Sequence, residues 1–364
     1  MQTPMKNIDE LFNQINFSTI LTTGRTGSDY LQGCLDNVPG VLTFSGVIFY
    51  YNFCDHFKLN DFEKLEPLKI LELFIEKNMH LLTQHIIDNK SVDLNIEKFK
   101  ENFNLVCDKR KLNRKKFLLA VYLAYHITLG RKTENIKVMV HHSHHVDETT
   151  RFLKDFKDSK LLVTIRDPRA NLKSGIVHWT NYRKIEDQRH YLFYIKRIRE
   201  DLKYAQEQIN EKFFLKLEEA GDLTTKKKLS DFLNIEFNPA INTATCAGQA
   251  WSGDKLSQFS SLDGKFMNQV VDNQWQGFFS KKDKLILNLI YRDYSSFGYK
   301  MERINWIKIV LIFFLIPLPF VFDKKIFTLS YYLEKNIRSK DKILGIFFYI
   351  KRILYFYTLL FKLG

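Results

Sequence analysis

Short apolar runs alternate along the chain with longer segments in which apolar residues recur every three or four positions. The short runs predict buried β-strands, and the recurrence is typical of amphipathic helices. Predicted strands lie at 15–23, 41–46, 135–145, 160–165 and 212–220. Predicted helices lie at 28–38, 147–156, 186–211 and 224–233. Strands that alternate with helices favour an α/β fold with a doubly wound parallel sheet.

One long segment, at about 57–130, departs from this alternation and carries helical patterning alone. Its sequences LEPLKILELFIEKNMHLLTQHII and RKKFLLAVYLAYHITLG place apolar residues three and four positions apart. Gly130 follows the second sequence, in the position where a glycine commonly ends a helix. The pattern therefore predicts a helical insertion within the α/β domain.

The last part of the chain, 301–364, contains two aromatic-rich apolar stretches. The first, 309–322, is shorter than the ~20 residues that span a bilayer and is interrupted by two prolines. The second, 343–364, is broken by Lys351 and Arg352, whose charges we expect to meet anionic lipid. We predict a monotopic or peripheral tail on the cytoplasmic face of a membrane. A buried terminal helix pair of the globular domain is the alternative.

Charge supports this interpretation of the tail. The whole chain of 364 residues carries a formal charge of +14, which indicates an anionic partner such as nucleic acid, phospholipid or a phosphorylated ligand. The segment 301–364 holds 11 Lys or Arg against 4 Asp or Glu, and so supplies half of that charge. Because these basic residues lie among long apolar runs, a membrane surface is favoured and nucleic acid is not expected.

The cysteines and the start of the chain bear on its compartment. The four cysteines show no CxxC pair and no regular spacing, so neither a zinc site nor a disulfide framework is indicated. The opening sequence MQTPMKNIDELFNQ contains acidic residues and no long apolar run, so no secretory signal is visible. These features predict a reducing, cytoplasmic location.

The sequence TTGRTGS, at residues 22–28, joins the first predicted strand to the first predicted helix. Backbone N–H groups at the start of a helix, together with the helix dipole, favour a bound anion there. The nucleotide-binding form of such a loop, GxxxxGK[ST], places a lysine at the helix start, whereas here the cation is Arg25, before the second glycine. A tight turn without a ligand is the structural alternative.

A second candidate anion site follows the predicted strand at 160–165. The sequence TIRDPRANLKSG supplies Arg166 at the end of that strand and Ser174 eight residues later. Pro168 is suited to the first turn of a helix. An arginine and a hydroxyl in this arrangement can hold a phosphate, although an isolated RDP sequence is more often a solvated turn or an ion pair.

Together, the two loops resemble those of sulfotransferases that use 3′-phosphoadenosine 5′-phosphosulfate (PAPS). That family has a (K/R)-(S/T)-G-(S/T) loop, then R-(D/N)-P with a serine eight residues after the arginine, and both patterns occur here. Weaker similarities are PGV at 39–41, FLKLEEA at 214–220, DFLNIEF at 231–237 and SSFGYK at 295–300. The resemblance implies a P-loop-like sulfotransferase domain over residues 1–300, followed by the tail.

The resemblance also assigns roles to residues of the two loops. It implies that the 5′-phosphosulfate of PAPS is held by Arg25, Thr26, Gly27 and Ser28. It implies that Arg166 and Ser174 hold the 3′-phosphate. Arg25 would neutralise the negative charge that develops on the departing phosphate, as positioned cations do in phosphoryl transfer. No metal is required by this chemistry.

Four histidines in the sequence VHHSHHVDE are candidates for the base that removes the acceptor's proton. Strand alternation places His142 and His144 on one face, and His141 and His145 on the other. Sulfotransferases often keep a catalytic histidine in a K-x-H pattern here, which by resemblance makes His144 the base and puts His142 in place of the lysine. A metal site, for which the sequence shows no third ligand, and a hydrogen-bonded His-rich loop are the alternatives.

The sequence therefore predicts a sulfotransferase that moves a sulfuryl group from PAPS to a hydroxyl of a glycan or glycolipid. Two hypotheses from other classes stay open at this point. One is a noncatalytic binding module on the same fold at a membrane surface, and the other is a P-loop kinase.

Overall fold

The structure is a computed structural model in which residues 8–83, 94–108, 110–183, 188–251, 253, 264–267, 271, 275–333 and 339–362 are described. The chain divides into two compact units. Unit 1 contains Met1–Thr22, Gly27–Thr164 and Glu207–Val271, and unit 2 contains Thr23–Thr26, Ile165–Gln206 and Asp272–Gly364.

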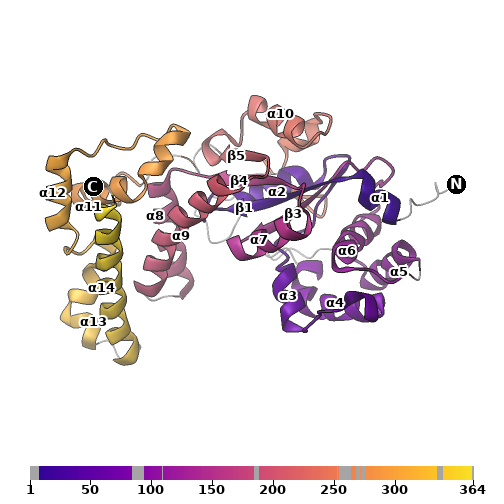
Figure 1. Ribbon diagram of the computed structural model, residues 1–364, viewed down its shortest axis with the longest axis horizontal. Helices are drawn as coiled ribbons and strands as arrows, with labels where there is room; N and C mark the ends of the chain where they lie inside the picture. The colour runs from indigo at the N-terminus through magenta and orange to yellow at the C-terminus, as the bar shows by residue number, and fades with distance from the viewer. Residues whose placement is uncertain are drawn as a thin grey trace. The chain divides into compact units, whose positions relative to one another are not determined.

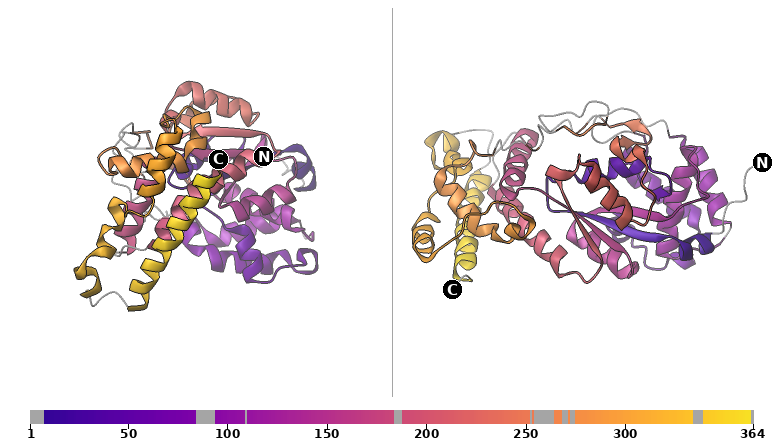
Figure 2. Two further views of the ribbon diagram at one scale, coloured as in Figure 1. Left: turned by 60° about the vertical axis from the view of Figure 1, so that its left-hand side comes forward. Right: turned by 90° about the horizontal axis from the view of Figure 1, so that it is seen from above.

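Unit 1 is built on a β-sheet. Its strands are β1 (Asn16–Thr22), β2 (Val41–Leu42), β3 (Val138–His144), β4 (Lys160–Ile165) and β5 (Lys212–Lys216). Over the described residues they form a five-stranded sheet in the order β2-β3-β1-β4-β5 (Figures 1 and 2). Strand β1 pairs in parallel with β3 and β4, and β2 pairs in parallel with β3. The predicted α/β fold with a parallel sheet is therefore confirmed.

Helices cover both faces of this sheet. On one face lie α2 (Ser28–Asp36) and α10 (Leu223–Phe232), whose apolar residues pack with Ile20, Val140 and Leu162 of the strands. On the other face, α6 (Arg114–Thr128) and α7 (Val146–Asp155) pack with Met139 (Figure 1). Because helices cover both faces, strands β1, β3 and β4 are buried almost throughout, including polar residues such as Thr19 of β1 and Ser143 of β3.

The helical insertion is present and begins earlier than predicted. It consists of α3 (Tyr50–His56), α4 (Pro67–Thr83), α5 (Ile96–Cys107) and α6. Helix α5 begins where the Asn95 side chain accepts a hydrogen bond from the backbone N–H of Lys98, and Asn113 caps α6 in the same way. Gly130 adopts a positive φ of 72° just after α6, as expected for a glycine that ends a helix. The predicted helical stretch at 84–93 lies outside the described residues.

Three further short elements belong to unit 1. Helix α1 (Ile8–Gln14) precedes β1, and its Ile8 and Leu11 are buried. Strands β6 (Thr245–Cys246) and β7 (Gln249–Ala250) form an antiparallel hairpin. The turn of this hairpin reaches the C-terminal end of α2, where it helps to form the network described below.

Unit 2 is helical over its described residues. Its helices are α8 (Pro168–Arg183), α9 (Gln188–Glu207), α11 (Lys281–Ile290), α12 (Trp306–Leu315), α13 (Leu329–Leu333) and α14 (Ser339–Phe361). Tyr291 and Tyr294 donate their hydroxyls to the carbonyls of Ile195 and Ile198, and so attach the segment after α11 to α9.

The tail is packed within unit 2. Arg352 of α14 donates two hydrogen bonds to the Asp323 carboxylate, and one of its nitrogens lies 3.3 Å from Gln188 Oε1 at the start of α9. Lys282 of α11 donates to the carbonyl of Pro319 at 2.8 Å. The predicted domain boundary after residue 300 therefore falls inside a compact unit, because residues of the tail supply part of its core.

Candidate functional site

The loop that carries Arg25 is held by side chains of α8 and α9 within unit 2. The backbone N–H of Arg25 donates to Asn171 Oδ1 and to the Tyr194 hydroxyl, both at 2.8 Å. Asn171 Nδ2 donates in turn to the carbonyl of Thr23 at 2.8 Å. Gly24 between them has φ +120°, and a Cβ there would lie 2.7 Å from both Asn171 Oδ1 and the Tyr194 oxygen. Only glycine fits this position without strain.

These contacts bring the two predicted anion motifs together. Asn171 lies on α8, between Arg166 and Ser174 in sequence, so the helix that follows the RDP motif also holds the Arg25 loop. Burial raises the pKa of the Tyr194 hydroxyl, and the positive charges of Arg25 and Arg166 both act against that shift. The two arginines predicted to bind phosphate therefore both affect the same buried hydroxyl, that of Tyr194.

Asp167 and Arg169 form a set of hydrogen bonds at the start of α8. Pro168 is its first residue, as predicted, and the Asp167 side chain accepts from the backbone N–H of Arg169 at 2.9 Å. The Arg169 guanidinium binds the same carboxylate with two nitrogens, at 2.9 and 2.7 Å, and lies 4.0 Å from the centre of the Trp275 ring. The acidic residue of the RDP motif therefore caps α8 and fixes Arg169.

The other half of the predicted loop belongs to unit 1. Gly27 precedes α2 with φ +81°, and glycine has no side chain with which to cap the first N–H groups of the helix. A Cβ at Gly27 would lie 2.5 Å from Leu217 Cδ1, so a larger residue would also collide with the chain after β5. Ser28 begins α2, as predicted. This helix start keeps the form of an anion site.

A row of three side chains connects α2 to the end of β3. Gln32 donates its Nε2 to the carbonyls of Phe44 and Gly46, at 2.6 and 3.0 Å. Its Oε1 lies 2.9 Å from His142 Nδ1, and His142 Nε2 lies 3.4 Å from His144 Nδ1. His142 and His144 are therefore neighbours on one side of the sheet, as strand alternation predicted.

The direction of these hydrogen bonds fixes the tautomers of both histidines. Two carbonyls accept from the Gln32 Nε2, so its Oε1 faces His142 and accepts a hydrogen bond from His142 Nδ1–H. His142 Nε2 then carries a lone pair and accepts from His144 Nδ1. His144 is left with an unprotonated Nε2, which is the form that a general base needs.

His142 is held in the neutral state. Burial, helped by the nearby His141 and His145, lowers its pKa to about 3. A neutral imidazole cannot supply the positive charge of the lysine that it replaces in the K-x-H comparison. Its geometry instead suits a positioning residue for His144.

The backbone changes direction at His144. The pairing of β1 with β3 passes from Ile20 and His142 directly to Leu21 and His144, so Ser143 is left out of register. His144 then adopts φ +63°, which is uncommon for a residue with a side chain. Such local strain is often found at functional sites. The change of backbone direction leaves the half-buried His144 side chain in the lining of a cavity.

The other two histidines have different surroundings. His141 is buried against α7, where its ring stacks on Phe152 at 5.1 Å and its Nδ1 lies 2.9 Å from the Tyr122 hydroxyl. His145 stacks on Phe49 at 5.4 Å. The structure thus separates His141 from the pair formed by His142 and His144. The prediction that His145 shares the face of His141 is wrong, because the His145 ring lies 4.8 Å from that of His144.

The cavity beside His144 has a volume of about 520 Å³ and lies within unit 1. Its walls combine aromatic rings with amide, carboxylate and basic side chains. The aromatic lining residues are Phe44, Phe49, Phe53 and Trp251, and the polar ones include Asp29, Gln32, Asn52, Lys77, Asn78 and His80. Asp29, in the first turn of α2, places its Oδ1 3.8 Å from His142 Nδ1. The candidate base and the helix start therefore border the same space.

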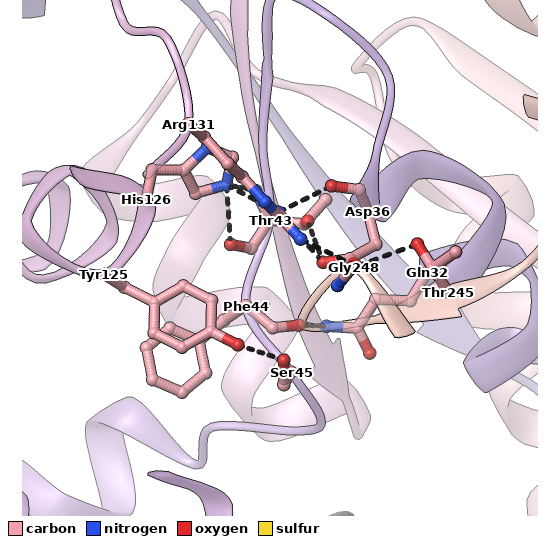
Figure 3. Close-up of polar contacts among 10 residues, drawn as sticks. All are labelled: Gln32, Asp36, Thr43, Phe44, Ser45, Tyr125, His126, Arg131, Thr245 and Gly248. Atoms are coloured by element: carbon pink, nitrogen blue, oxygen red, sulfur yellow. Dashed lines mark hydrogen bonds and ion pairs between the residues drawn. The ribbon is translucent and has the colours of Figure 1, made fainter. Parts of the chain in front are cut away.

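A buried ion pair supports the floor of this cavity (Figure 3). Arg131 donates to both carboxylate oxygens of Asp36, at 3.1 and 2.9 Å. Thr245 and the backbone N–H of Gly248 donate to the same carboxylate, at 2.9 and 3.0 Å. Burial alone would raise the pKa of Asp36, but the Arg131 charge and these hydrogen bonds hold it below its ordinary value. The network ties α2, the end of α6 and the β6–β7 turn together.

The sequence analysis did not identify Gln32, Asn171, Tyr194 or the ion pair. Each acts on a partner far away in the chain, and none belongs to a recognisable motif. Among the residues that the structure describes, no group of three His, Cys, Asp or Glu side chains lies close enough together to hold a metal ion.

Comparison with known proteins gives structural matches alone. No protein-family model matches the chain, and no curated protein matches it. The chain is similar to the sulfotransferase domain of the Synechococcus PCC 7002 olefin synthase, with 14% identity, 83% of this chain and 99% of that domain covered, and a TM-score of 0.42. It is also similar to the sulfotransferase domain from the curacin biosynthetic pathway, with 13% identity, 79% of this chain and 100% of that domain covered, and a TM-score of 0.46. A third similar structure is the sulfotransferase STF9 from Mycobacterium avium, with 14% identity, 64% of this chain and 68% of that chain covered, and a TM-score of 0.35.

Proposed function

We propose that this protein transfers a sulfuryl group from PAPS to a hydroxyl of a glycan or glycolipid acceptor. The observation that carries the proposal is the attachment of the Arg25 loop to Asn171 of α8. Helix α8 also begins two residues after Arg166 and contains Ser174. The loop that would hold one end of PAPS is thus hydrogen-bonded to the helix that carries Ser174, which would hold the other end.

The residues present fit a ligand with separate anionic groups. Arg25 and Arg166 both lie close enough to Tyr194 to oppose its pKa shift, which concentrates positive charge there. Gly24 and Gly27 adopt positive φ where a Cβ would collide, so no side chain crowds these two positions. The N–H of Arg25 is bonded to Asn171 and Tyr194, and that of Thr26 to the Gly24 carbonyl, so the backbone donors for an anion would be those at the start of α2. PAPS, when bound, would supply the sulfuryl group and a nucleoside bisphosphate as leaving group.

Each residue then has a defined task. Arg25, Thr26, Gly27 and Ser28 would hold the 5′-phosphosulfate. Arg166 and Ser174 would hold the 3′-phosphate. The Arg25 guanidinium would also stabilise negative charge as it develops on the leaving phosphate, a contribution that is large in sites with little water.

His144 would remove the proton of the acceptor hydroxyl. Its Nε2 carries the required lone pair because Gln32 orients His142 and His142 accepts from His144 Nδ1. General base catalysis of this kind contributes about 10² to 10⁴ in rate. Gln32 and His142 act through His144 and are positioning residues.

The cavity beside His144 favours a sugar-containing acceptor. Aromatic rings such as Phe49 and Trp251 offer flat apolar faces against which the C–H groups of a sugar ring can pack. Asn52, Asn78 and Lys77 supply hydrogen-bonding groups for hydroxyls around the same space. A mainly apolar cavity with a few polar groups is typical of small-ligand sites.

Single-turnover transfer from labelled PAPS to a panel of sugar and glycolipid acceptors tests this proposal. His144→Ala should remove most transfer and leave nucleotide affinity nearly unchanged, and Gln32→Met should slow transfer and alter its pH profile. His56→Ala, which changes an exposed histidine of α3, is the matched control. Nucleotide binding without transfer to any acceptor would favour a noncatalytic binding module.

A further inference from the structure

The helices of the tail present a large apolar surface to solvent within unit 2. On α12 the exposed side chains include Trp306, Ile307, Val310 and Phe314, and on α14 they include Ile343, Phe347, Ile350, Leu354 and Phe361. Soluble proteins rarely expose bulky apolar side chains in such numbers on neighbouring helices. We name these nine residues the tail surface.

Helix α14 has two opposite faces. Positions 343, 347, 350, 354 and 361 recur at helical spacing and form its exposed apolar stripe. Positions 345, 349, 352 and 356 recur in the same way, and all four are buried against the rest of unit 2. Helix α14, the long helix near the C-terminus in Figure 2, therefore binds its own protein with one face and leaves an apolar face exposed.

The exposed faces of α12 and α14 are continuous. The ring of Phe313 on α12 lies 5.1 Å from that of Tyr357 and 6.4 Å from that of Phe361, both on α14. The Tyr357 hydroxyl donates to the carbonyl of Phe313 at 2.9 Å. These contacts hold the end of α12 against the end of α14, so the exposed faces of the two helices adjoin there.

The buried face of α14 shows how the helix is retained in the protein. Arg352 is 2% exposed and pairs with Asp323, and its guanidinium lies 5.0 to 5.9 Å from the ring centres of Tyr349, Phe320, Phe322 and Phe356. The prediction that Arg352 meets lipid headgroups is therefore wrong, because this arginine is enclosed by protein. Among the described residues, Lys342–Phe361 is the one helix long and apolar enough to cross a membrane. The Arg352 pair holds it against unit 2 instead.

We infer that the tail surface binds the surface of an anionic lipid bilayer, with α12 and α14 lying in the plane of the membrane. Charge complementarity supports this occupant. Lys351 and Lys362 are exposed on α14 or directly after it, and Lys351 Nζ lies 4.4 Å from the centre of the Phe347 ring. The sequence 301–364 carries 11 basic residues against 4 acidic ones. Lysine beside aromatic and aliphatic residues is typical of helices in the headgroup region.

A protein partner fits these observations less well. The cores of protein interfaces are depleted in lysine, whereas Lys351 lies against Phe347 of the apolar stripe of α14. A second copy of this chain would bring like charges together, whereas anionic lipid neutralises them. The inference concerns a surface separate from the proposed catalytic residues and does not depend on sulfuryl transfer.

Vesicle flotation of the full-length protein tests the inference. Wild type should float with vesicles that contain phosphatidylserine and less well with phosphatidylcholine alone. The double variant Phe314→Ser, Leu354→Ser replaces residues that are 69% and 58% exposed, and should lower the vesicle partition coefficient by about tenfold or more. The control Leu105→Ser, Leu223→Ser, at 66% and 50% exposure in unit 1, should float like wild type.

Charge and orientation are tested on the same material. Lys351→Glu should reduce flotation with phosphatidylserine and leave the weaker binding to phosphatidylcholine nearly unchanged, whereas Lys98→Glu on α5 should have no effect. Alkaline carbonate should release the bound protein, because in-plane helices do not span the bilayer. The inference would be overturned if wild type failed to float or if the bound protein resisted carbonate. It would also be overturned if the Phe314→Ser, Leu354→Ser variant still floated but lost a concentration-dependent dimer.

Discussion

Replacement of Asn171 by alanine tests how the structure holds the Arg25 loop. The buried Asn171 amide accepts from the N–H of Arg25 at 2.8 Å and from the Tyr194 hydroxyl at 3.2 Å, and donates to the carbonyl of Thr23 at 2.8 Å. A hydrogen bond contributes about 1 kcal/mol net, and the Tyr194 oxygen can still accept from Arg25. We expect the variant to lose about 2 to 3 kcal/mol of unfolding free energy.

The same change should weaken nucleotide binding. Without Asn171 the loop is no longer fixed to α8, so the Arg25 guanidinium loses its orientation toward the ligand. A charge-assisted contact is worth about 1.5 to 3 kcal/mol, which corresponds to a loss of roughly tenfold to a hundredfold in affinity if it is lost completely. Calorimetric titration with adenosine 3′,5′-bisphosphate measures this loss, and chemical denaturation measures the change in stability.

Asn210→Ala is the matched control. Its amide donates to the carbonyls of Lys157 and Ser159, at 3.0 and 2.9 Å, in unit 1. We expect this variant to lose some stability and to bind the nucleotide like wild type. Wild-type affinity in Asn171→Ala, or an equal loss in Asn210→Ala, would refute the link between this amide and the Arg25 loop.

Three further variants test other parts of the structure. Gly24→Ala should weaken nucleotide binding at least tenfold in the same titration, because its Cβ would collide with the side chains that hold the loop, whereas Gly277→Ala, with nothing within 4 Å, should not. Burial lowers the pKa of His141 to about 3, so between pH 6.5 and 3 the unfolded chain binds a proton that the folded chain does not, and stability falls as the pH falls. When the pH is lowered from 7 to 5, the unfolding free energy of His141→Phe should therefore fall by about 2 kcal/mol less than that of wild type. Denaturation at both pH values measures this difference, and the same pH dependence in both proteins would contradict the reasoning. Asp36→Ala leaves Arg131 buried without its carboxylate and should cost about 3 to 5 kcal/mol in unfolding free energy, whereas the double variant Asp36→Leu, Arg131→Met should cost clearly less.

Local patterns in the sequence were sufficient to predict the sheet and the first candidate residues. The apolar run before residue 23 became β1, and the helix after Gly27 begins at Ser28. Alternation along β3 placed His142 and His144 on one side, although His144 reaches its position through a positive φ that no local pattern signals.

The contacts that orient the site could not be predicted in this way. Gln32 and His142 are 110 residues apart, and Arg25 and Asn171 are 146 apart. Such pairs depend on how whole helices pack, and a single sequence carries no periodic signal for them. Arg352 shows the same limit, because its charge within an apolar helix suggested lipid headgroups, whereas Asp323 and four aromatic rings enclose it.

The most direct test of the proposed function is a calorimetric titration of the wild-type protein with adenosine 3′,5′-bisphosphate in the absence of magnesium. The structure predicts binding that falls at least about tenfold in both Arg25→Ala and Arg166→Ala, because each removes a charge-assisted contact to a phosphate. Affinities within about twofold of wild type in both folded variants, or tighter binding of magnesium-ATP than of the bisphosphate, would contradict the assignment of these arginines to PAPS.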